Sequence, residues 1–515
     1  MAAPLRHALT ALLWAAMGLI YLPLLPAAVQ LLMPALTLAN GQALLGDPQL
    51  PQAALATMVS TLIAVVGAFA LALSVVAALW PSQQWQRLAA RLPLLLALPH
   101  VAFASAALLL FAEGGWLFRQ FPQITPPIDR YGIGLGLTLA VKESVFLLWA
   151  MYALTAEKGL AEQGLTLRSQ GYGRWQCVAW IVLPRLLPQL RIVLLATAAW
   201  TLSAVDVALI LGPGNPPTLA VLAWQWLSQG DALQQAQGSL ACLLLILMLA
   251  ALVLVAHLLW RAFRARVPDF QGVRHPQPLA LPGNVLAWLL PLSGVLCAVT
   301  LGLLSDSQLA NIDSINNSLW LALGASLISL ILCLLWLEYG PQRCYSLIWA
   351  CIWLPLVLPA LPLVAGQYQL ALLSWQDGEW LTVLWGHLLW VVPWMLFILL
   401  PAWRRLDPRL LTIARTLGWT RWRCFWQVKS PLLLRPILAA LAVGFSVSIA
   451  QYLPTLWLGA GRITTLTTDA VALSSGGSTP MLATQALWQL LLPGCFFLLI
   501  ALLLRWLGHY RQGLR

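Results

Sequence analysis

Long uninterrupted apolar runs constrain this chain more than any other feature of its sequence. The stretches Leu55 to Trp80 and Ser239 to Trp260 each exceed the roughly 20 apolar residues that a helix needs to cross a bilayer. The strands of a membrane β-barrel alternate apolar and polar residues and never build such runs. The runs therefore predict an all-α polytopic membrane protein.

The composition excludes a soluble enzyme. Of the 515 residues, 61% are apolar and 9% are charged, whereas soluble domains average about 45–50% and about 25%. The mean hydropathy is +0.83. Too few charged side chains remain to cover a surface that faces water.

Twelve segments are long and apolar enough to be membrane-spanning helices. Their approximate bounds are 8–31, 55–80, 92–112, 131–153, 190–212, 239–260, 284–304, 316–337, 346–366, 379–402, 437–459 and 484–506. With the amino terminus inside, all but four of the 28 basic residues lie on the inner side, and the exceptions are Arg119, Arg130, Lys142 and Arg462. This positive-inside bias predicts that both termini are cytoplasmic. The net charge of +12 is thus a topology signal, and no nucleic-acid partner is expected.

Neither a cleaved leader nor a metal site is expected. The apolar stretch within residues 1–28 is longer than the 7–15 residues of a signal-peptide core, so we expect a retained first span. The eight cysteines lie in spans or on the inner side without closely spaced pairs, which argues against disulfides and against zinc. The six histidines are scattered along the chain.

An internal repeat relates the two halves of the chain at a constant displacement of 247 residues. The first motif comprises Arg168, Gly171, Arg174, Trp175, Cys177, Pro184 and Leu186, which fall on Arg415, Gly418, Arg421, Trp422, Cys424, Pro431 and Leu433. The second comprises Leu211, Gly212, Gly214, Thr218 and Leu219, which fall on Leu458, Gly459, Gly461, Thr465 and Leu466. The repeat predicts two tandem six-span halves, 1–260 and 284–515, joined by a basic cytoplasmic linker, 261–283.

Two inner segments, about 154–190 and 402–437, are unusually long for connections between spans. In the second, Pro408 fits the first position of a helix, and Gly418 suits a helix end that needs a left-handed residue. Thr420 can cap a second short helix. We therefore expect a helix, a glycine turn and a second helix, with aromatic residues exposed for a partner.

These inner segments resemble the EAA loop of ABC-importer permeases, in which a glycine precedes a final Leu-Pro at a fixed spacing. Gly171 with Pro184, and Gly418 with Pro431, have that spacing. Pro431 is also expected to end the second short helix. The namesake residues are mostly absent, since only Ala414 of the second segment matches, so the contacts of the family's glutamate are not carried over.

The resemblance covers both halves and is greatest to the fused two-half permeases of ferric-iron, thiamine and related importers, the Ynj-type permeases among them. It implies a type I importer fold and these ATPase-coupling residues: Arg168, Gly171, Arg174, Trp175, Pro184, Ala414, Arg415, Gly418, Arg421, Trp422 and Pro431.

The family resemblance also implies partners in and around the bacterial inner membrane. These are two copies of a cytoplasmic ABC ATPase, a periplasmic substrate-binding protein and the lipid bilayer. No glycine in this chain is followed by lysine, so the chain has no phosphate-binding loop of the Gly-Lys-Ser/Thr type. We therefore expect no enzymatic activity and no cofactor on this chain, with MgATP bound by the partner ATPase.

Ionisable side chains inside spans are costly and mark either a pathway or a structural pair. Lys142 and Glu143 lie in the fourth span and Asp206 in the fifth. Opposite charges favour an ion pair that locks these two spans together, and a place in the translocation pathway is the alternative. Gln451 and Tyr452 are further pathway candidates, because related permeases carry an acidic–aromatic pair nearby. An ordinary interhelical hydrogen bond is their alternative role.

Glycines follow the fifth and eleventh predicted spans and allow tight turns there. By analogy with the family, the residues near the outer gate or the receptor are Gly212, Gly214, Gly459, Gly461 and Arg462. Simple turns are the alternative.

An ion-coupled secondary transporter with twelve spans is the alternative function. Transporters of the major facilitator class carry a Gly-Asp-Arg-Gly loop after the second span, whereas residues 81–91 contain neither glycine nor aspartate. The transported solute stays open, with ferric ion, thiamine and a polyamine all compatible with the sequence.

Overall fold

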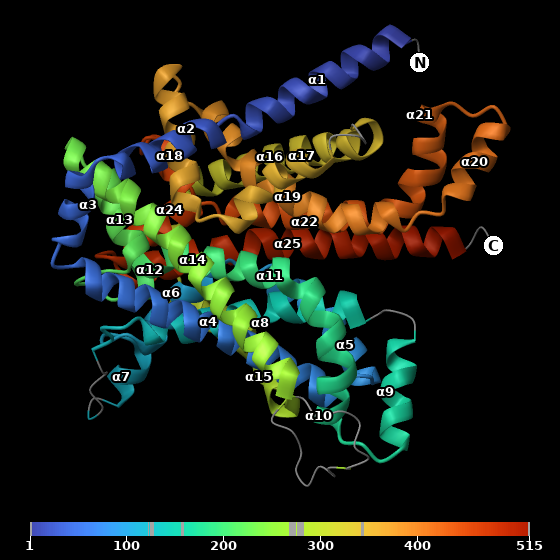
Figure 1. Ribbon diagram of the computed structural model, residues 1–515, viewed down its shortest axis with the longest axis horizontal. Helices are drawn as coiled ribbons and strands as arrows, with labels where there is room; N and C mark the ends of the chain where they lie inside the picture. The colour runs from blue at the N-terminus through green and yellow to red at the C-terminus, as the bar shows by residue number, and fades with distance from the viewer. Residues whose placement is uncertain are drawn as a thin grey trace.

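The structure is a computed structural model that describes residues 3–121, 123, 128–155, 159–266, 274, 283–340 and 345–512. Every regular element in these residues is a helix (Figure 1). Among them, eleven helices are long and apolar enough to cross a membrane, and a helix pair bent by 113° supplies a twelfth. The predicted all-α fold with about twelve spans is confirmed.

The helices of the first half follow the predicted spans closely. The main helices of its spans are α1 (Ala3–Tyr21), α4 (Leu50–Leu79), α6 (His100–Phe111), α8 (Ile133–Thr155), α11 (Leu183–Ser203) and α14 (Ala232–Arg266). Its other helices are α2 (Leu24–Leu32), η1 (Met33–Leu36), α3 (Leu38–Leu45), α5 (Gln83–Leu96), α7 (Trp116–Gln120), α9 (Leu160–Ser169), α10 (Arg174–Cys177), η2 (Val178–Val182), α12 (Asp206–Leu211) and α13 (Leu219–Leu227).

The second half repeats this order. Its long helices are α15 (Gly283–Leu304), α16 (Ile312–Tyr339), α17 (Tyr345–Val357), α18 (Ala360–Leu373), α19 (Trp380–Arg404), α22 (Ser430–Ile449) and α25 (Thr479–Gln512). Its shorter helices are η3 (Ser307–Leu309), α20 (Pro408–Thr416), α21 (Arg421–Cys424), η4 (Phe425–Lys429), α23 (Leu453–Leu458) and α24 (Leu466–Ser474).

Two predicted spans are broken at a proline. The helix predicted over 92–112 is divided into α5 and α6 at Pro99, and the helix predicted over 346–366 is divided into α17 and α18 at Pro359. A proline disfavours helical backbone at the residue before it, so each proline separates one helix from the next. Each half therefore has a proline break at its third span, but in the first half the apolar span itself begins only after the break, at His100, and covers His100–Gln120.

Two further spans are broken where continuous helices were predicted over 190–212 and 437–459. Helix α11 ends at Ser203 before α12, and α22 ends at Ile449 before α23. In the first half a tertiary contact accompanies the break, because the Ala360 N–H of α18 donates to Ser203 Oγ at 3.3 Å. Neither break carries a proline or glycine between its two helices, although Pro454 lies in the first turn of α23.

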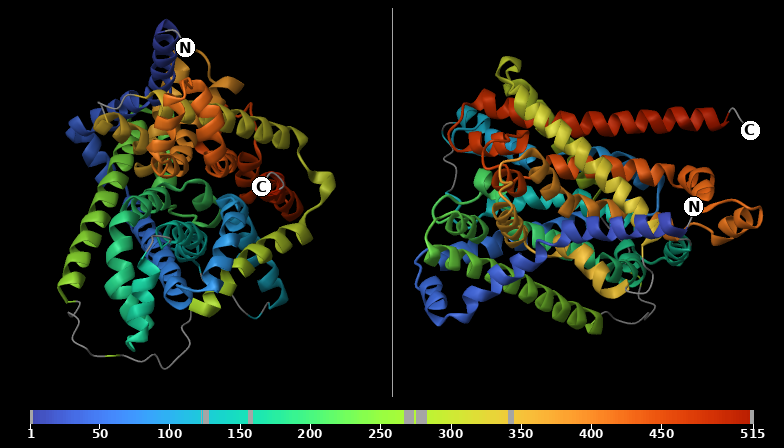
Figure 2. Two further views of the ribbon diagram at one scale, coloured as in Figure 1. Left: turned by 90° about the vertical axis from the view of Figure 1, so that its right-hand side faces the viewer. Right: turned by 90° about the horizontal axis from the view of Figure 1, so that it is seen from above.

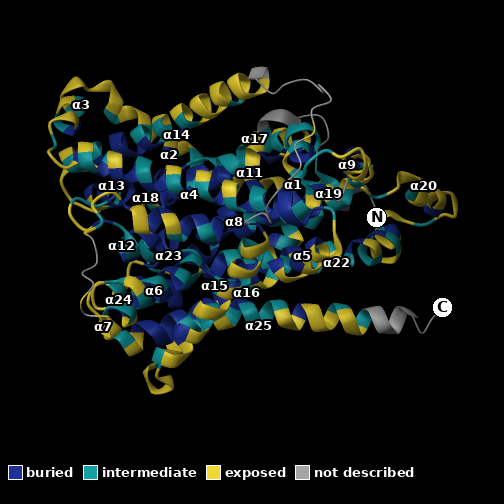
Figure 3. Cartoon of the chain, turned by 90° about the horizontal axis from the view of Figure 1, so that it is seen from below, coloured by how far each residue is buried: buried dark blue, intermediate teal, exposed yellow. Residues whose placement is uncertain are grey.

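The two halves interlock instead of lying side by side. Helix α1 packs on α16 and α19 of the second half, and α15 packs on α4 and α6 of the first. Figure 2 (left) shows α15 beside the blue helices of the first half. The most buried spans are α19 and α8, which form the centre, whereas α25 is largely exposed (Figure 3). A bundle of this kind leaves its outer helices facing lipid.

The two ends of the bundle carry different elements. Helices α9, α10, α20 and α21 lie at the same end as both chain termini (Figure 1). Helices α3, α7, α13 and α24 lie at the other end. The predicted linker 261–283 is only partly described: α14 extends through its first residues to Arg266, and residues 267–273 and 275–282 lie outside the described residues.

Candidate functional site

A cavity of about 320 Å³ lies between the two halves of the chain. Helices α8 and α11 line it from the first half, and α19 and α22 line it from the second. Much of its wall is aromatic, with side chains from both halves: Phe146, Trp149, Trp200, Trp390, Trp394 and Phe397. The interface between repeats is where transporters commonly hold their substrate.

All four helix breaks meet at this cavity. Residues that line it include Pro99, Ala204, Leu358 and Ala450, one from each break. A helix end leaves backbone N–H or C=O groups without intrahelical partners. Such groups are tolerated inside a membrane only where they are buried in protein or face a water-filled space. The breaks therefore give an otherwise apolar bundle a polar centre.

All five pathway candidates predicted from sequence line the same cavity. These residues are Lys142, Glu143, Asp206, Gln451 and Tyr452. The first two come from the middle of α8, the third begins α12, and the last two lie in the break between α22 and α23. The fold thus brings together polar groups that are more than 300 residues apart in the chain.

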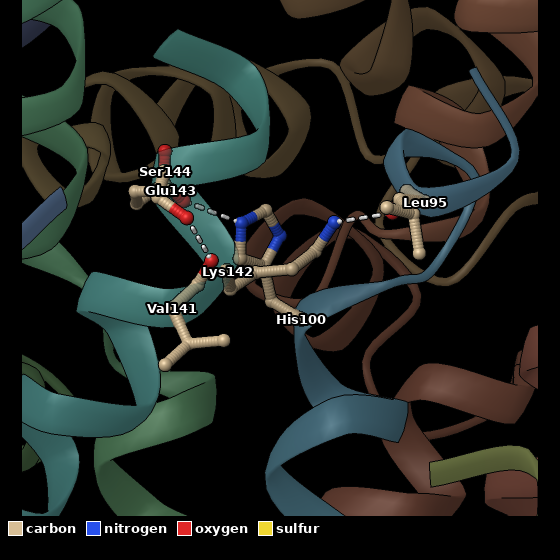
Figure 4. Close-up of polar contacts among 6 residues, drawn as sticks. All are labelled: Leu95, His100, Val141, Lys142, Glu143 and Ser144. Carbon is tan, nitrogen blue, oxygen red and sulfur yellow. Dashed lines mark hydrogen bonds and ion pairs between the residues drawn. The ribbon is translucent and has the colours of Figure 1, made fainter. Parts of the chain in front are cut away.

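The ionisable groups of α8 are held by partners from the broken third span (Figure 4). Lys142 Nζ donates to the Leu95 carbonyl at 3.2 Å. Glu143 Oε1 lies 2.7 Å from His100 Nε2. Both α8 side chains thus contact the break between α5 and α6, so a movement of that break would disturb both.

The expected ion pair between Lys142 and Asp206 is wrong. Lys142 and Asp206 form no ion pair in the described residues, where Glu143 hydrogen-bonds His100 and Glu338 pairs with Lys429. The carboxylate of Asp206 accepts no side-chain hydrogen bond in the described part of the chain; it is half-buried at the cavity wall, and His100 lies close enough to interact with its charge. The amino-terminal turn of α12 stabilises it instead, through the Val207 N–H.

His100 is a cavity residue that the sequence did not single out. Its ring lies 4.1 Å from the Trp200 ring, centroid to centroid, while its Nε2 contacts Glu143. It therefore connects α6, α8 and α11. Its position directly after Pro99, at the start of a half-helix, was the one signal in the sequence that set it apart from the other histidines.

A second missed histidine supports the break in the second half. His387 is 1% exposed, with Nδ1 2.8 Å from Ser448 Oγ and Nε2 2.9 Å from Thr455 Oγ1. These hydroxyls belong to α22 and α23, so one imidazole of α19 joins the two helices on either side of the break. This arrangement positions Gln451 and Tyr452.

The helix–turn–helix predicted in the second inner segment is confirmed. Helix α20 begins at Pro408, where the Asp407 carboxylate accepts from the Arg409 N–H at 2.9 Å. Gly418 has a φ of +77°, and Thr420 Oγ1 then caps α21 by accepting from an N–H. The first segment is built alike, with α9, Gly171 at a φ of +90°, and α10.

The expectation that Pro431 ends the second helix is wrong. Residues Arg421–Ile449 form one helical span, because the five π-helical residues of η4 come between α21 and α22. Pro431 lies in the first turn of α22, directly after η4, where a missing N–H is tolerated. The first half repeats this with η2 and Pro184. Each of the two inner segments, about 154–190 and 402–437, is therefore continuous with a span. We refer to them as the coupling segments, after the role that the family resemblance implies.

The coupling segments expose apolar side chains at the end of the bundle. In the second segment Ile413, Leu417 and Trp422 are 57%, 68% and 55% exposed. In the first segment Leu165 and Trp175 are 53% and 41% exposed. The predicted Arg168, Arg174, Ala414, Arg415 and Arg421 lie on the same short helices or at their ends. Apolar residues exposed together at one end of a bundle are typical of a protein contact surface.

The predicted outer-gate residues lie at the opposite end of the bundle, in the turns after α12 and α23. Gly212 and Gly459 follow the last residues of these two helices, and Gly214 lies in the turn after α12. Gly461 has a φ of +72°, in the left-handed region. Arg462 is exposed, and its guanidinium covers the backbone at Gly378.

Comparison with known proteins identifies the family. The chain is 62% identical over 515 residues to the inner membrane ABC transporter permease protein YnjC of Escherichia coli (strain K12), with 100% of both chains covered. It is 27% identical over 101 residues to the spermidine/putrescine transport system permease protein PotC homolog of Mycoplasma genitalium, covering 20% of this chain and 35% of that protein. No solved structure matches.

Residues 342–511 match the family described as "Binding-protein-dependent transport system inner membrane component". The resemblance inferred from the inner segments is thus confirmed, and the alternative of a secondary transporter is not supported. With a full-length relative at this identity and a cavity between two six-span halves, the chain belongs to the family of multi-pass inner membrane ABC transporter permeases.

Proposed function

We propose that the cavity between the halves is the translocation pathway for a small solute imported across the inner membrane. The observation that carries this proposal is that four helix breaks and all five polar candidates converge on that one cavity. A solute delivered from the outer side occupies the cavity while the outer turns are open, and leaves it when α11 and α22 tilt about their breaks.

Two ATPase copies drive this cycle, one on each coupling segment. The apolar residues of α9–α10 and α20–α21 are available for docking, and each segment continues as a rigid helix into α11 or α22. A rotation of the docked ATPase is therefore transmitted directly to the cavity wall. MgATP binds the partner subunit, since this chain has no phosphate-binding loop.

A periplasmic binding protein docks at the end that carries α13 and α24. Arg462 is exposed there and can meet an acidic surface. Both termini and the coupling segments lie at the other end (Figure 1), and the positive-inside bias makes that end cytoplasmic. The acidic and basic pathway candidates Lys142, Glu143 and Asp206 all come from the first half. At the equivalent positions the second half has Leu389, Trp390 and Leu453. The two walls of the pathway consequently differ.

The test is ATP hydrolysis in proteoliposomes that hold this chain with its co-encoded ATPase. We expect hydrolysis to rise when the loaded, co-encoded binding protein is added, and to stay at its basal rate with the unloaded protein. An ATPase that fails to associate, together with uptake driven by an ion gradient alone, would overturn the proposal.

Neutralising Asp206 should impair transport without destabilising the fold. Its carboxylate is half-buried and has no side-chain hydrogen bond to lose, so the unfolding midpoint of Asp206→Asn should equal or exceed that of the parent. Transport should fall by about tenfold because the polarity of the cavity changes. Solute uptake and thermal unfolding of the purified protein measure the two effects.

Asp231→Asn is the matched control, because Asp231 is an exposed acid at the start of α14 and lies away from the cavity. It should change neither quantity. A large loss of stability in Asp206→Asn would instead assign Asp206 a structural role.

A further inference from the structure

A basic hollow lies on the side of the bundle between α11 and α14. It encloses about 450 Å³ and is lined by Arg191 of α11 and by His257, Trp260, Arg261 and Arg264 of α14. His257, Arg261 and Arg264 follow one another at helical spacing, so they share one face of α14. Two helices therefore bring three guanidinium groups to one place.

None of the described residues that line this hollow carries a carboxylate to balance its charge. The ion pairs formed within the described residues lie elsewhere in the structure. All three arginines are exposed. Like charges held close together repel one another, and an anion seated among them removes that repulsion. The hollow is thus built to attract an anion.

The surface beside the hollow is apolar and exposed. Ile192 of α11 is 56% exposed, and Val253 and Leu254 of α14 are 47% and 59% exposed. Helical spacing places both α14 residues on the face that carries the basic residues. Trp260 stacks on Phe263 with the ring centroids 5.8 Å apart, and aromatic residues of this kind favour the membrane–water boundary. The site is therefore amphiphilic, with cationic groups at one end and apolar groups along the spans.

We propose that this hollow binds the phosphate headgroup of an anionic phospholipid, whose acyl chains lie against Val253 and Leu254. Arginine forms paired hydrogen bonds with phosphate oxygens, and basic pockets between spans attract anionic headgroups on the cytoplasmic side. The carboxyl-terminal part of helix α14 points toward the end of the bundle where both chain termini lie (Figure 2, right). The cytoplasmic assignment of that end rests on the proposed function. The apolar surface favours a lipid over a soluble phosphate compound.

Lipid binding to the full-length chain in detergent tests this inference, since it requires neither an ATPase nor a membrane orientation. Native mass spectrometry would measure binding of dioleoyl phosphatidylglycerol and of dioleoyl phosphatidylcholine. We expect the parent protein to bind phosphatidylglycerol more tightly than phosphatidylcholine. The double variant Arg191→Gln/Arg261→Gln should bind phosphatidylglycerol about 30-fold more weakly than the parent does. Binding of phosphatidylcholine should change little.

The matched control is Arg87→Gln/Arg91→Gln, which removes two exposed arginines from one face of α5. This control should retain its affinity for phosphatidylglycerol within about twofold. If both double variants lost the same affinity for phosphatidylglycerol, the proposed site would be overturned, because the loss would then reflect surface charge alone. Glycerol 1-phosphate that competes as strongly as the lipid would overturn the lipid assignment in favour of a soluble phosphate compound.

Discussion

Replacing Gly418 with valine is expected to detach or uncouple the ATPase while the protein still inserts and folds. Gly418 has a φ of +77°, and a Cβ built there meets no atom within 4 Å. The substitution therefore acts on the backbone alone. A left-handed conformation costs an L-residue about 1–2 kcal/mol, and a β-branched residue more.

The strain acts on the orientation of α20 relative to α21. If only a fraction of the molecules keep the native turn, the apparent affinity for a partner falls by that fraction. A cost of about 2 kcal/mol corresponds to a decrease of roughly 30-fold in ATPase affinity. Co-purification of the ATPase and receptor-stimulated hydrolysis are the measurements.

Gly418→Asn is the matched control, because asparagine adopts the left-handed region far more readily than valine. It should retain ATPase binding near the parent level. Gly171 is less suitable for this test, because a Cβ there would come within 3.1 Å of the Arg274 side chain and add a steric contact to the backbone effect. Unchanged ATPase association in Gly418→Val would remove this turn from the coupling machinery.

The fold was predictable wherever the signal is local. Apolar run length gave the twelve spans, and Gly418 with Thr420 gave the helix–turn–helix because caps and left-handed turns depend on a few neighbouring residues. The breaks at Pro99 and Pro359 also have a local cause. The sequence placed prolines there but did not distinguish them from Pro393, which stays inside α19.

The remaining features depend on contacts between distant segments. The break after Ser203 coincides with a hydrogen bond from α18, and the break after Ile449 with the contacts of His387. No local pattern encodes the first of these breaks, whereas Pro454, in the first turn of α23, is a local signal for the second. The partner of Lys142 was mispredicted for the same reason: charge alone pointed to Asp206, whereas the broken third span supplies the Leu95 carbonyl. The sequence thus identified the residues that line the cavity, but it did not identify their hydrogen-bond partners.

Breaking the buried ion pair of the second half should cost more stability than any other single substitution considered. Lys429 Nζ, in η4, pairs with Glu338 at the end of α16, and it lies 4.6 Å from the Trp403 ring centroid. The side chains of the pair are only 10% and 8% exposed. Lys429→Met leaves the Glu338 carboxylate buried without its partner, which typically costs about 3–5 kcal/mol. The thermal unfolding midpoint of the purified protein measures the loss.

The double variant Lys429→Met/Glu338→Gln separates the charge from the packing. Because it removes both charges, it should recover most of the stability that the single variant loses. Arg423→Gln is the control for a cation of the same segment: Arg423 is exposed, bonds Gln427 at 3.0 Å, and should cost less than about 1 kcal/mol. A double variant as unstable as Lys429→Met would attribute the loss to the packing of the lysine stem against Trp403. A stable single variant would mean that Glu338 reaches water, and that the coupling segment is joined to the eighth span by packing alone.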